Sequence, residues 1–154
     1  MLPGGYNNNY QIVQGPGYVA ILSEMIHDVR IIPTDGRPHV PAGVRMWAGD
    51  SRGRWEGNTL VVDTTNFTNK TAWRGSSEKL HLIERFSRPD FNTLQYEVTV
   101  DDPGAYTATW TGGFLLRWSP GTELFEYVCQ DNNRSPEGMV GLETSVSRTS
   151  AIVP

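Results

Sequence analysis

Residues 79–100 read KLHLIERFSRPDFNTLQYEVTV, and this stretch decides the fold class of the 154-residue chain. Apolar and polar side chains alternate on both sides of a turn signal, PDFN at 89–92. The composition of 79–86 would allow a helix, but a period of two fits that stretch as well and clearly describes 93–100. The pattern therefore predicts two antiparallel strands joined as a hairpin.

Short strands of the same kind are predicted on both sides of this hairpin. Gly- and Pro-containing turns separate them, for example at 15–17, 57–58 and 119–121. A long, charged, turn-rich loop over 35–56 separates an N-terminal hairpin from the later strands. The expected strands are 10–14, 18–24, 28–32, 59–64, 79–86, 93–100, 106–111, 114–118 and 124–129.

About eight or nine short strands joined mostly by tight turns predict an all-β chain with one domain. We expect a single antiparallel β-barrel, a lipocalin-like meander, because closure removes the edges that such a sheet would expose. A β-sandwich is the alternative. The barrel is expected over 10–134, after a loose N-terminal arm over 1–9 and before a C-terminal tail over 135–154 that could hold a short helix.

The amino-acid composition argues against several classes of binding partner and site. The net charge is −4 with charges of both signs mixed along the chain, so no basic surface for nucleic acid is predicted. No apolar run approaches the roughly 20 residues of a membrane-spanning helix. The N-terminus as given lacks the cationic and apolar regions of a secretory signal. A lone cysteine, Cys129, excludes an internal disulfide and a cysteine-based zinc cluster.

Three carboxylates fall in apolar surroundings when alternation sorts side chains by face. Glu84 and Glu126 each lie within an apolar row, and Asp63 lies beside Val61. Such a carboxylate must be paired, or its pKa rises through desolvation and it can serve as a general acid or base. We therefore name Glu84 and Glu126 as candidate catalytic residues.

The more ordinary role for both glutamates is a structural ion pair, since such pairs also shift pKa values. The arginines considered as partners are Arg30, Arg37 and Arg85. The opposite face has two interpretations as well. It is either a solvated surface with cross-strand charge pairs, which is the more ordinary case, or the polar lumen of a barrel. Its charged members are His81, Arg85, Glu97 and Arg117.

The loop over 35–56 and its surroundings supply the candidate substrate-binding residues. The basic side chains are expected to close the mouth of the barrel over a polar or anionic substrate group. The tryptophans could stack on a planar or sugar-like ligand, although core packing is their more ordinary role. The named residues are His27, Arg30, Arg37, His39, Trp47, Trp55 and Tyr96.

Other chemistries have less support. His27, His39 and His81 show none of the short spacings of a zinc site, so no metal ligand and no other cofactor is predicted. Ser51 lies in GDSRG, which is not the G-x-S-x-G motif of a triad hydrolase.

The blocks DGRPH and GDSRGRWEGNTLVVDT resemble a family of uncharacterised, mostly secreted proteins of soil and environmental bacteria. The resemblance implies a secreted or periplasmic location and, in longer relatives, an export signal and an N-terminal extension. Many relatives have a histidine directly after the cysteine of the last predicted strand, where this chain has Gln130. The family brings no established activity. The similar blocks cover residues 10–14, 17–22, 32–39, 49–64, 80–86, 93–103 and 126–133.

These observations favour a small-molecule-binding β-barrel that acts as an acid–base enzyme, an isomerase, cyclase or lyase with a mainly apolar substrate. Glu84 and Glu126 would exchange protons with that substrate. One alternative is a non-catalytic ligand-binding or structural protein of the cell envelope. Another is a metal-dependent enzyme with histidine and carboxylate ligands. Self-association into a homo-oligomer is compatible with the sequence.

Overall fold

The computed structural model describes residues 8–70 and 75–124. In these ranges the only helical element is a 3-10 turn, η1 (Met25–His27), and no helix could cross a membrane. The all-β prediction is therefore confirmed.

The predicted strand at 124–129, Glu126 and the C-terminal tail lie outside the described residues. The strands are β1 (Tyr10–Gly15), β2 (Tyr18–Ser23), β3 (Val29–Pro33), β4 (Asp50–Glu56), β5 (Thr59–Thr65), β6 (His81–Asp90), β7 (Thr93–Asp101) and β8 (Trp110–Arg117).

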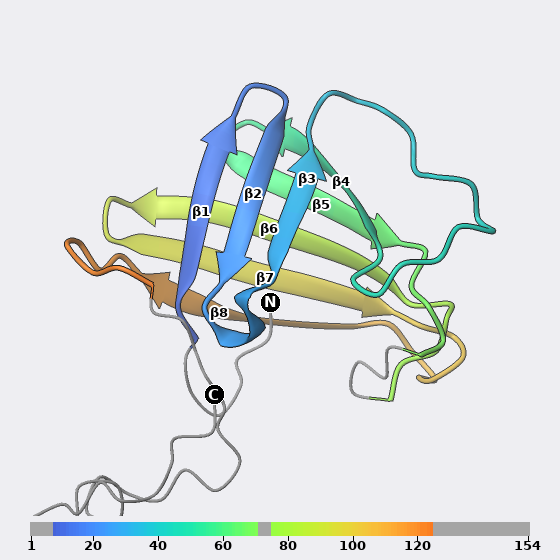
Figure 1. Cartoon of the computed structure of the whole chain (residues 1–154). Coiled ribbons are helices and arrows are strands. Elements are labelled where there is room, and N and C mark those ends of the chain that lie inside the picture. Colours follow the sequence, from blue (N-terminus) through green and yellow to red (C-terminus); the bar gives the residue numbers. More distant parts are fainter. Residues whose placement is uncertain (1–7, 71–74, 125–154) are drawn as a thin grey trace, which may run out of the picture.

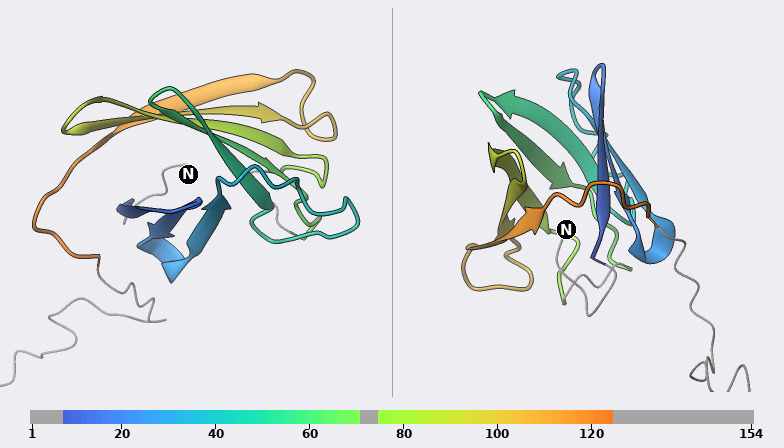
Figure 2. Two further views of the ribbon diagram at one scale, coloured as in Figure 1. Left: turned by 90° about the horizontal axis from the view of Figure 1, so that it is seen from above. Right: turned by 90° about the vertical axis from the view of Figure 1, so that its left-hand side faces the viewer.

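These strands form two antiparallel sheets, each ordered as in the sequence (Figure 1). The small sheet contains β1, β2 and β3, and the large sheet contains β4 to β8. Figure 2 shows the small sheet facing the large one, with its strands running across those of the large sheet. No ladder joins the two sheets in the described ranges. The described strands form no closed barrel, and the two facing sheets fit the sandwich-like alternative equally well.

The apolar core lies between the two sheets. Val19, Ile21 and Ile32 face it from the small sheet. The inward positions of β5, β6 and β7 face it from the large sheet, which confirms the faces that alternation assigned to β6 and β7. Full burial of one large apolar side chain contributes about 1.5–3 kcal/mol. The buried apolar residues of the large sheet include Leu60, Val62, Leu82, Phe86, Tyr96, Val98 and Val100.

Strand β4 corrects the predicted loop over 35–56, since residues 50–56 pair with β5. A glycine at its centre brings it close to the small sheet. A Cβ atom on Gly53 would lie 2.9 Å from the Cγ2 atoms of both Ile32 and Thr34. Gly53 therefore lets the backbone of β4 pass directly against the end of β3.

Strand β8 corrects a second prediction, because it continues through two glycines that were expected to form a turn. Gly112 and Gly113 pair with β7, and the predicted strands over 106–111 and 114–118 are replaced by one. A Cβ atom on Gly113 would lie 2.4 Å from the backbone oxygen of Tyr96. The glycine is thus explained by the close approach of two strands.

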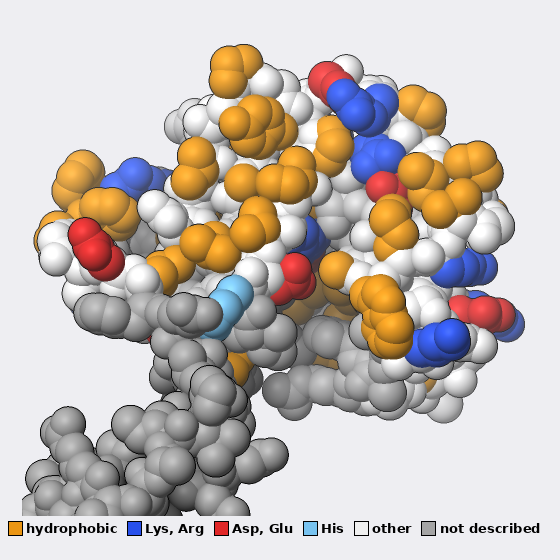
Figure 3. All heavy atoms as spheres, in the orientation of Figure 1, with side chains coloured by type: hydrophobic (Ala, Val, Ile, Leu, Met, Phe, Trp, Pro, Cys, Tyr) orange, Lys and Arg blue, Asp and Glu red, His pale blue; other side chains and the backbone are white. Residues whose placement is uncertain are grey.

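The outer faces of the two sheets differ in polarity. On the small sheet, Val13, Tyr18, Val29 and Ile31 are 40–54% exposed, and no charged residue shares their face. Figure 3 shows the apolar side chains spread over this face. The outer face of the large sheet instead carries charged and polar side chains. The chemistry of the molecule therefore lies on and within the large sheet.

Candidate functional site

Two polar clusters lie back to back on the large sheet, and two strands, β4 and β5, contribute to both. Asp50 and Asp63 point to the outer face, whereas their neighbours Ser51 and Thr64 point to the core. Ser51 lies directly opposite Thr64 in the ladder between β4 and β5. Because side chains alternate along a strand, the sequences GDS and VDT each contribute one side chain to each face.

The inner cluster is a buried network of Arg30, Ser51, Thr64, Glu84 and Tyr96. Arg30 reaches in from β3 and binds both carboxylate oxygens of Glu84, with 3.0 Å between Nη1 and Oε1 and a second bond from Nη2 to Oε2. Arg30 also donates to Ser51 Oγ and Thr64 Oγ1, both at 2.9 Å. Tyr96 Oη donates to Glu84 Oε1 at 2.9 Å. Every polar group of the Glu84 side chain therefore has a partner.

The protonation states in this network are set by burial and by the charges of its own residues. Burial would raise the pKa of Glu84, but the charge and hydrogen bonds of Arg30 outweigh it and hold the pKa at about 2. Burial and then the Glu84 carboxylate raise the pKa of Tyr96. Burial would lower the pKa of Arg30, but the Glu84 charge raises it. Glu84 is therefore an ionised counter-ion, which is the ion pair that the sequence offered as the alternative to catalysis.

The outer cluster consists of His39, Asp50, Arg52, Asp63 and His81. His39 lies between two carboxylates, with its Nδ1 2.9 Å from Asp50 Oδ2 and its Nε2 3.1 Å from Asp63 Oδ1. His81 Nε2 is also 3.1 Å from Asp63 Oδ1, and Arg52 Nη1 is 2.6 Å from Asp50 Oδ1. The side chains of His39, Asp63 and His81 are 30–34% exposed, whereas Glu84 is fully buried. A dissolved ligand can therefore reach this cluster.

Hydrogen-bond chemistry assigns different roles to the two histidines. An ionised carboxylate can only accept, so His39 makes both of its bonds together only as an imidazolium with hydrogen on both nitrogens. His81 needs hydrogen on Nε2 alone to bind Asp63, and within the described ranges its Nδ1 has no hydrogen-bond partner. An imidazole oriented in this way by a carboxylate presents its second nitrogen as a proton acceptor.

The structure brings some of the predicted residues together and separates others. Arg30, Glu84 and Tyr96 meet in the buried network, whereas His39 belongs to the outer cluster. No sequence signal had joined His39 to His81. Among the described residues, no group of three or more His, Cys, Asp and Glu side chains is arranged to hold a metal ion.

Four other predicted residues occupy different surroundings. Arg37 forms an exposed ion pair with Asp35, two residues earlier. His27 ends η1 and hydrogen-bonds a backbone carbonyl of the same turn. Trp47 and Trp55 are 65% and 47% exposed, so the expectation that they pack in the core is wrong.

Sequence reasoning missed Asp50 and Ser51 because it placed β4 in a loop, and it assigned no partner to Thr64, which lies in the expected strand over 59–64. A usable signal was present. The Gly57-Asn58 turn, taken as the centre of a hairpin, sets Ser51 opposite Thr64 and leaves both adjacent aspartates on the other face.

Two shallow depressions also lie on the large sheet, one over β7 and β8 and one over β5 to β7. The first has a volume of about 340 Å³ and the second of about 100 Å³. Gln95 and Glu97 line both. Open surface is thus available to a ligand on the outer face, whereas the apolar core lies between the sheets.

Comparisons with protein-family models, with curated proteins and with solved structures found no match.

Proposed function

We propose that this protein binds a small polar molecule on the outer face of the large sheet and catalyses a proton transfer there, as an isomerase, cyclase or lyase does. The observation that carries the proposal is that His39 and His81 both contact one oxygen of Asp63 at an accessible surface. His81 is the general base, and Asp63 orients it. His39 contacts the same oxygen of Asp63 beside them.

This proposal assigns proton transfer to His81, although the sequence had suggested Glu84. Glu84 is inaccessible, its oxygens are occupied by Arg30 and Tyr96, and its low pKa keeps it ionised. Histidine is the side chain best suited to exchange protons near neutral pH. Glu126 stays a sequence-based candidate for a second proton-transfer group.

In the proposed reaction, His81 Nδ1 takes a proton from the substrate and becomes positively charged while Asp63 stabilises that charge. An isomerase or cyclase returns the proton to another substrate atom. A lyase returns it to the leaving group. The cross-strand neighbour of His81 is Asp101, so the substrate meets carboxylates on two sides and presents neutral or cationic polar groups to them.

The outer face of the large sheet is mainly polar, and this changes the substrate class expected from the sequence. A mainly apolar substrate in a lipocalin-like lumen would need space inside the molecule, where Ile32, Tyr96 and Val98 are at most 1% exposed. A closed barrel with such a lumen stays an alternative proposal. The resemblance to secreted proteins supports a secreted or periplasmic location, which fractionation of the native host would test.

Nuclear magnetic resonance of the histidine side chains tests the proposal directly. The full chain is titrated with a panel of small carboxylic acids, amines and sugars, and the His27, His39 and His81 ring signals are followed. A ligand of the proposed site shifts the His39 and His81 signals and leaves His27 unchanged. Any compound that binds is then followed for conversion to an isomer or an elimination product.

Two variants separate catalysis from binding. His81→Gln should retain binding and lose turnover by about 10²–10⁴-fold, the usual contribution of a general acid or base. His27→Asn is the matched control, because asparagine tolerates the positive φ of 57° at that position. Binding without conversion would favour the non-catalytic ligand-binding protein, and turnover that survives His81→Gln would exclude His81 as the base.

A further inference from the structure

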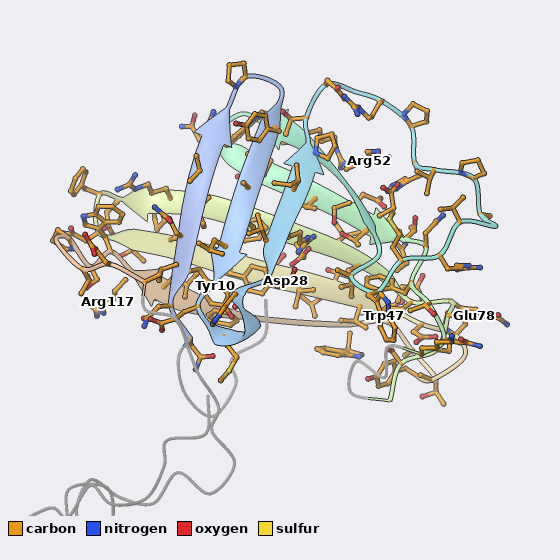
Figure 4. The ribbon with its side chains drawn as sticks, viewed as in Figure 1. Tyr10, Asp28, Trp47, Arg52, Glu78 and Arg117 are labelled. Carbon is orange, nitrogen blue, oxygen red and sulfur yellow. The ribbon has the colours of Figure 1, made fainter. Side chains whose placement is uncertain are left out.

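Strand β1 is the outer strand of the small sheet, and β2 is the only described strand that pairs with it. It begins at Tyr10, which Figure 4 labels, and it ends at Gly15. The four residues between these two ends are all exposed. The side of β1 that faces away from β2, which we call the open edge, is therefore available to another strand.

The register of β1 and β2 shows which backbone groups point to the open edge. In an antiparallel ladder, hydrogen-bonded pairs alternate with non-bonded pairs. The Glu24 N–H donates to the Asn9 carbonyl at 3.0 Å, so these two residues form a bonded pair directly before the first residues of the ladder. Counting from this pair, the odd-numbered residues of β1 bond β2. The residues that direct both N–H and C=O to the open edge are Tyr10, Ile12 and Gln14.

The open edge lacks the features that usually prevent pairing with another chain. Natural proteins protect such an edge with charged side chains, proline or a bulge. Strand β1 reads YQIVQG and has a regular register, so it carries none of them. The other outer strands of the two sheets do differ. Strand β8 ends in Arg117, β4 has charged residues at four positions, and β3 ends in Pro33.

We propose that β1 pairs antiparallel with β1 of a second copy of this chain, around a twofold axis beside Ile12. In this register Ile12 lies opposite Ile12 of the second copy, Tyr10 lies opposite Gln14, and Gln11 lies opposite Val13. Residues opposite each other then lie on the same face of the joined sheet, as strand pairing requires. Every N–H and C=O group of the open edge has a partner in the other strand, because the twofold axis repeats each contact.

The distribution of charge favours a second copy as the occupant. The chain has a net charge of −4, so most contacts between two copies bring like charges together. No charged residue lies on β1 or on the outer face of the small sheet. Pairing also covers part of Ile12 and Val13, which are 41% and 47% exposed. The open edge is therefore a place where two copies meet without electrostatic repulsion and with a gain in apolar burial.

This inference does not depend on the proposed enzymatic function, because the outer cluster lies on the large sheet. Analytical ultracentrifugation of the full chain over about 10 μM to 1 mM tests it, since a contact of one strand from each copy is small and of the weak, transient kind. The expected result is a monomer at the lowest concentration and a growing fraction of dimer above it. A chain that stays monomeric throughout would overturn the inference.

A pair of matched variants locates the contact. Ile12→Lys sets two lysines directly opposite each other across the twofold axis and should raise the dimer Kd about tenfold or more. Ile31→Lys is the control, because Ile31 is 54% exposed on the outer face of β3, away from the open edge. It should leave the Kd within about twofold of the unchanged chain. A dimer that resists Ile12→Lys, or one that Ile31→Lys weakens equally, would overturn the inference.

Amide hydrogen exchange at low and high concentration tests the backbone pairing itself. Protection of the Ile12 and Gln14 N–H groups should rise with concentration, whereas Val13, which bonds β2, should be protected at both. Val98 in β7 reports whether the Ile12→Lys variant keeps the native core. Protection of Ile12 and Gln14 that is already complete in the monomer would assign the open edge to another part of the same chain. That result would overturn the inference as well.

Discussion

The buried network and the outer cluster share adjacent residues of β4 and β5, yet they differ in whether solvent can reach their charged groups. In the buried network, Arg30 and Tyr96 occupy both oxygens of Glu84, and water does not reach the carboxylate. In the outer cluster, Asp63 binds two histidines at a surface that is about one third exposed. A carboxylate with all of its partners inside the protein stabilises the fold, whereas one that shares its partners with solvent can take part in chemistry.

This contrast shows why an unusual position for a carboxylate is weak evidence of catalysis by itself. Glu84 was the more conspicuous residue in the sequence, because it lies in an apolar row. Its burial required a counter-ion of matching geometry, and that counter-ion removed its reactivity. Asp63 was less conspicuous and retained an accessible imidazole partner.

The largest expected effect comes from breaking the buried network on one side. Arg30→Met leaves Glu84 buried with Tyr96 as its remaining donor in the network. The free energy of unfolding should fall by about 3–5 kcal/mol, as when one partner of a buried pair is removed. Urea denaturation measures the change. The double variant Arg30→Met/Glu84→Leu should recover most of the loss, and a double variant as unstable as the single one would contradict the account.

Acid should weaken the ion pair between Arg30 and Glu84. Because the folded pKa of Glu84, about 2, lies below its ordinary value of 4.5, its stabilisation is complete above pH 4.5 and is lost as pH falls toward 2. The shift corresponds to about 3 kcal/mol. Unfolding free energies measured between pH 7 and 2 should show this loss. The double variant Arg30→Met/Glu84→Leu should lack that part of the pH dependence.

A smaller effect is expected when a neutral donor is removed from the network. Tyr96→Phe deletes the hydroxyl that donates to Glu84 Oε1 and keeps the ring that packs against Phe86 and Phe114. Stability should fall by about 1–3 kcal/mol, the cost of leaving a buried acceptor short of one bond. Urea denaturation of this variant at pH 7 gives the value. A change as large as that of Arg30→Met would contradict the greater weight given to the guanidinium.

The smallest change in stability is expected in the outer cluster. Asp63→Asn replaces a partly exposed carboxylate, and such ion pairs contribute about 0–1 kcal/mol. Its effect on the proposed ligand site should be large, because the orientation of His81 is lost. Denaturation and the histidine signals used in ligand titration measure the two effects in one sample. A large loss of stability with unchanged ligand binding would make Asp63 a structural residue like Glu84.

The sequence predicted the parts of the fold in which apolar and polar residues alternate. The inner faces of β6 and β7 were assigned correctly, because Leu82 and Phe86, and Tyr96 and Val98, alternate with polar neighbours. Arg30 was named among the possible partners of Glu84. The all-β class followed from the same pattern.

Strand β4 had no such pattern, and the missed part of the candidate site follows from it. Its inward positions are Ser51, Gly53 and Trp55, where a hydroxyl serves Arg30 and a missing side chain makes room for Ile32. A strand that faces a polar partner and a close backbone contact does not need apolar residues. The sequence also could not show that His39 and His81 share a partner, since they are linked only through a third residue, Asp63, on another strand.

The alternating use of the GDS and VDT sequences has a consequence for how the chain selects its native pairing during folding. A slip of β4 by one residue would turn Asp50 toward the core in place of Ser51, and it would carry Ser51 out of reach of Arg30. One error would thus bury an unpaired charge and leave a second charge without its partners. The charges on both faces of β4 therefore distinguish the native pairing of β4 with β5 from a pairing shifted by one residue. They matter most in β4, because its inward positions carry few apolar side chains.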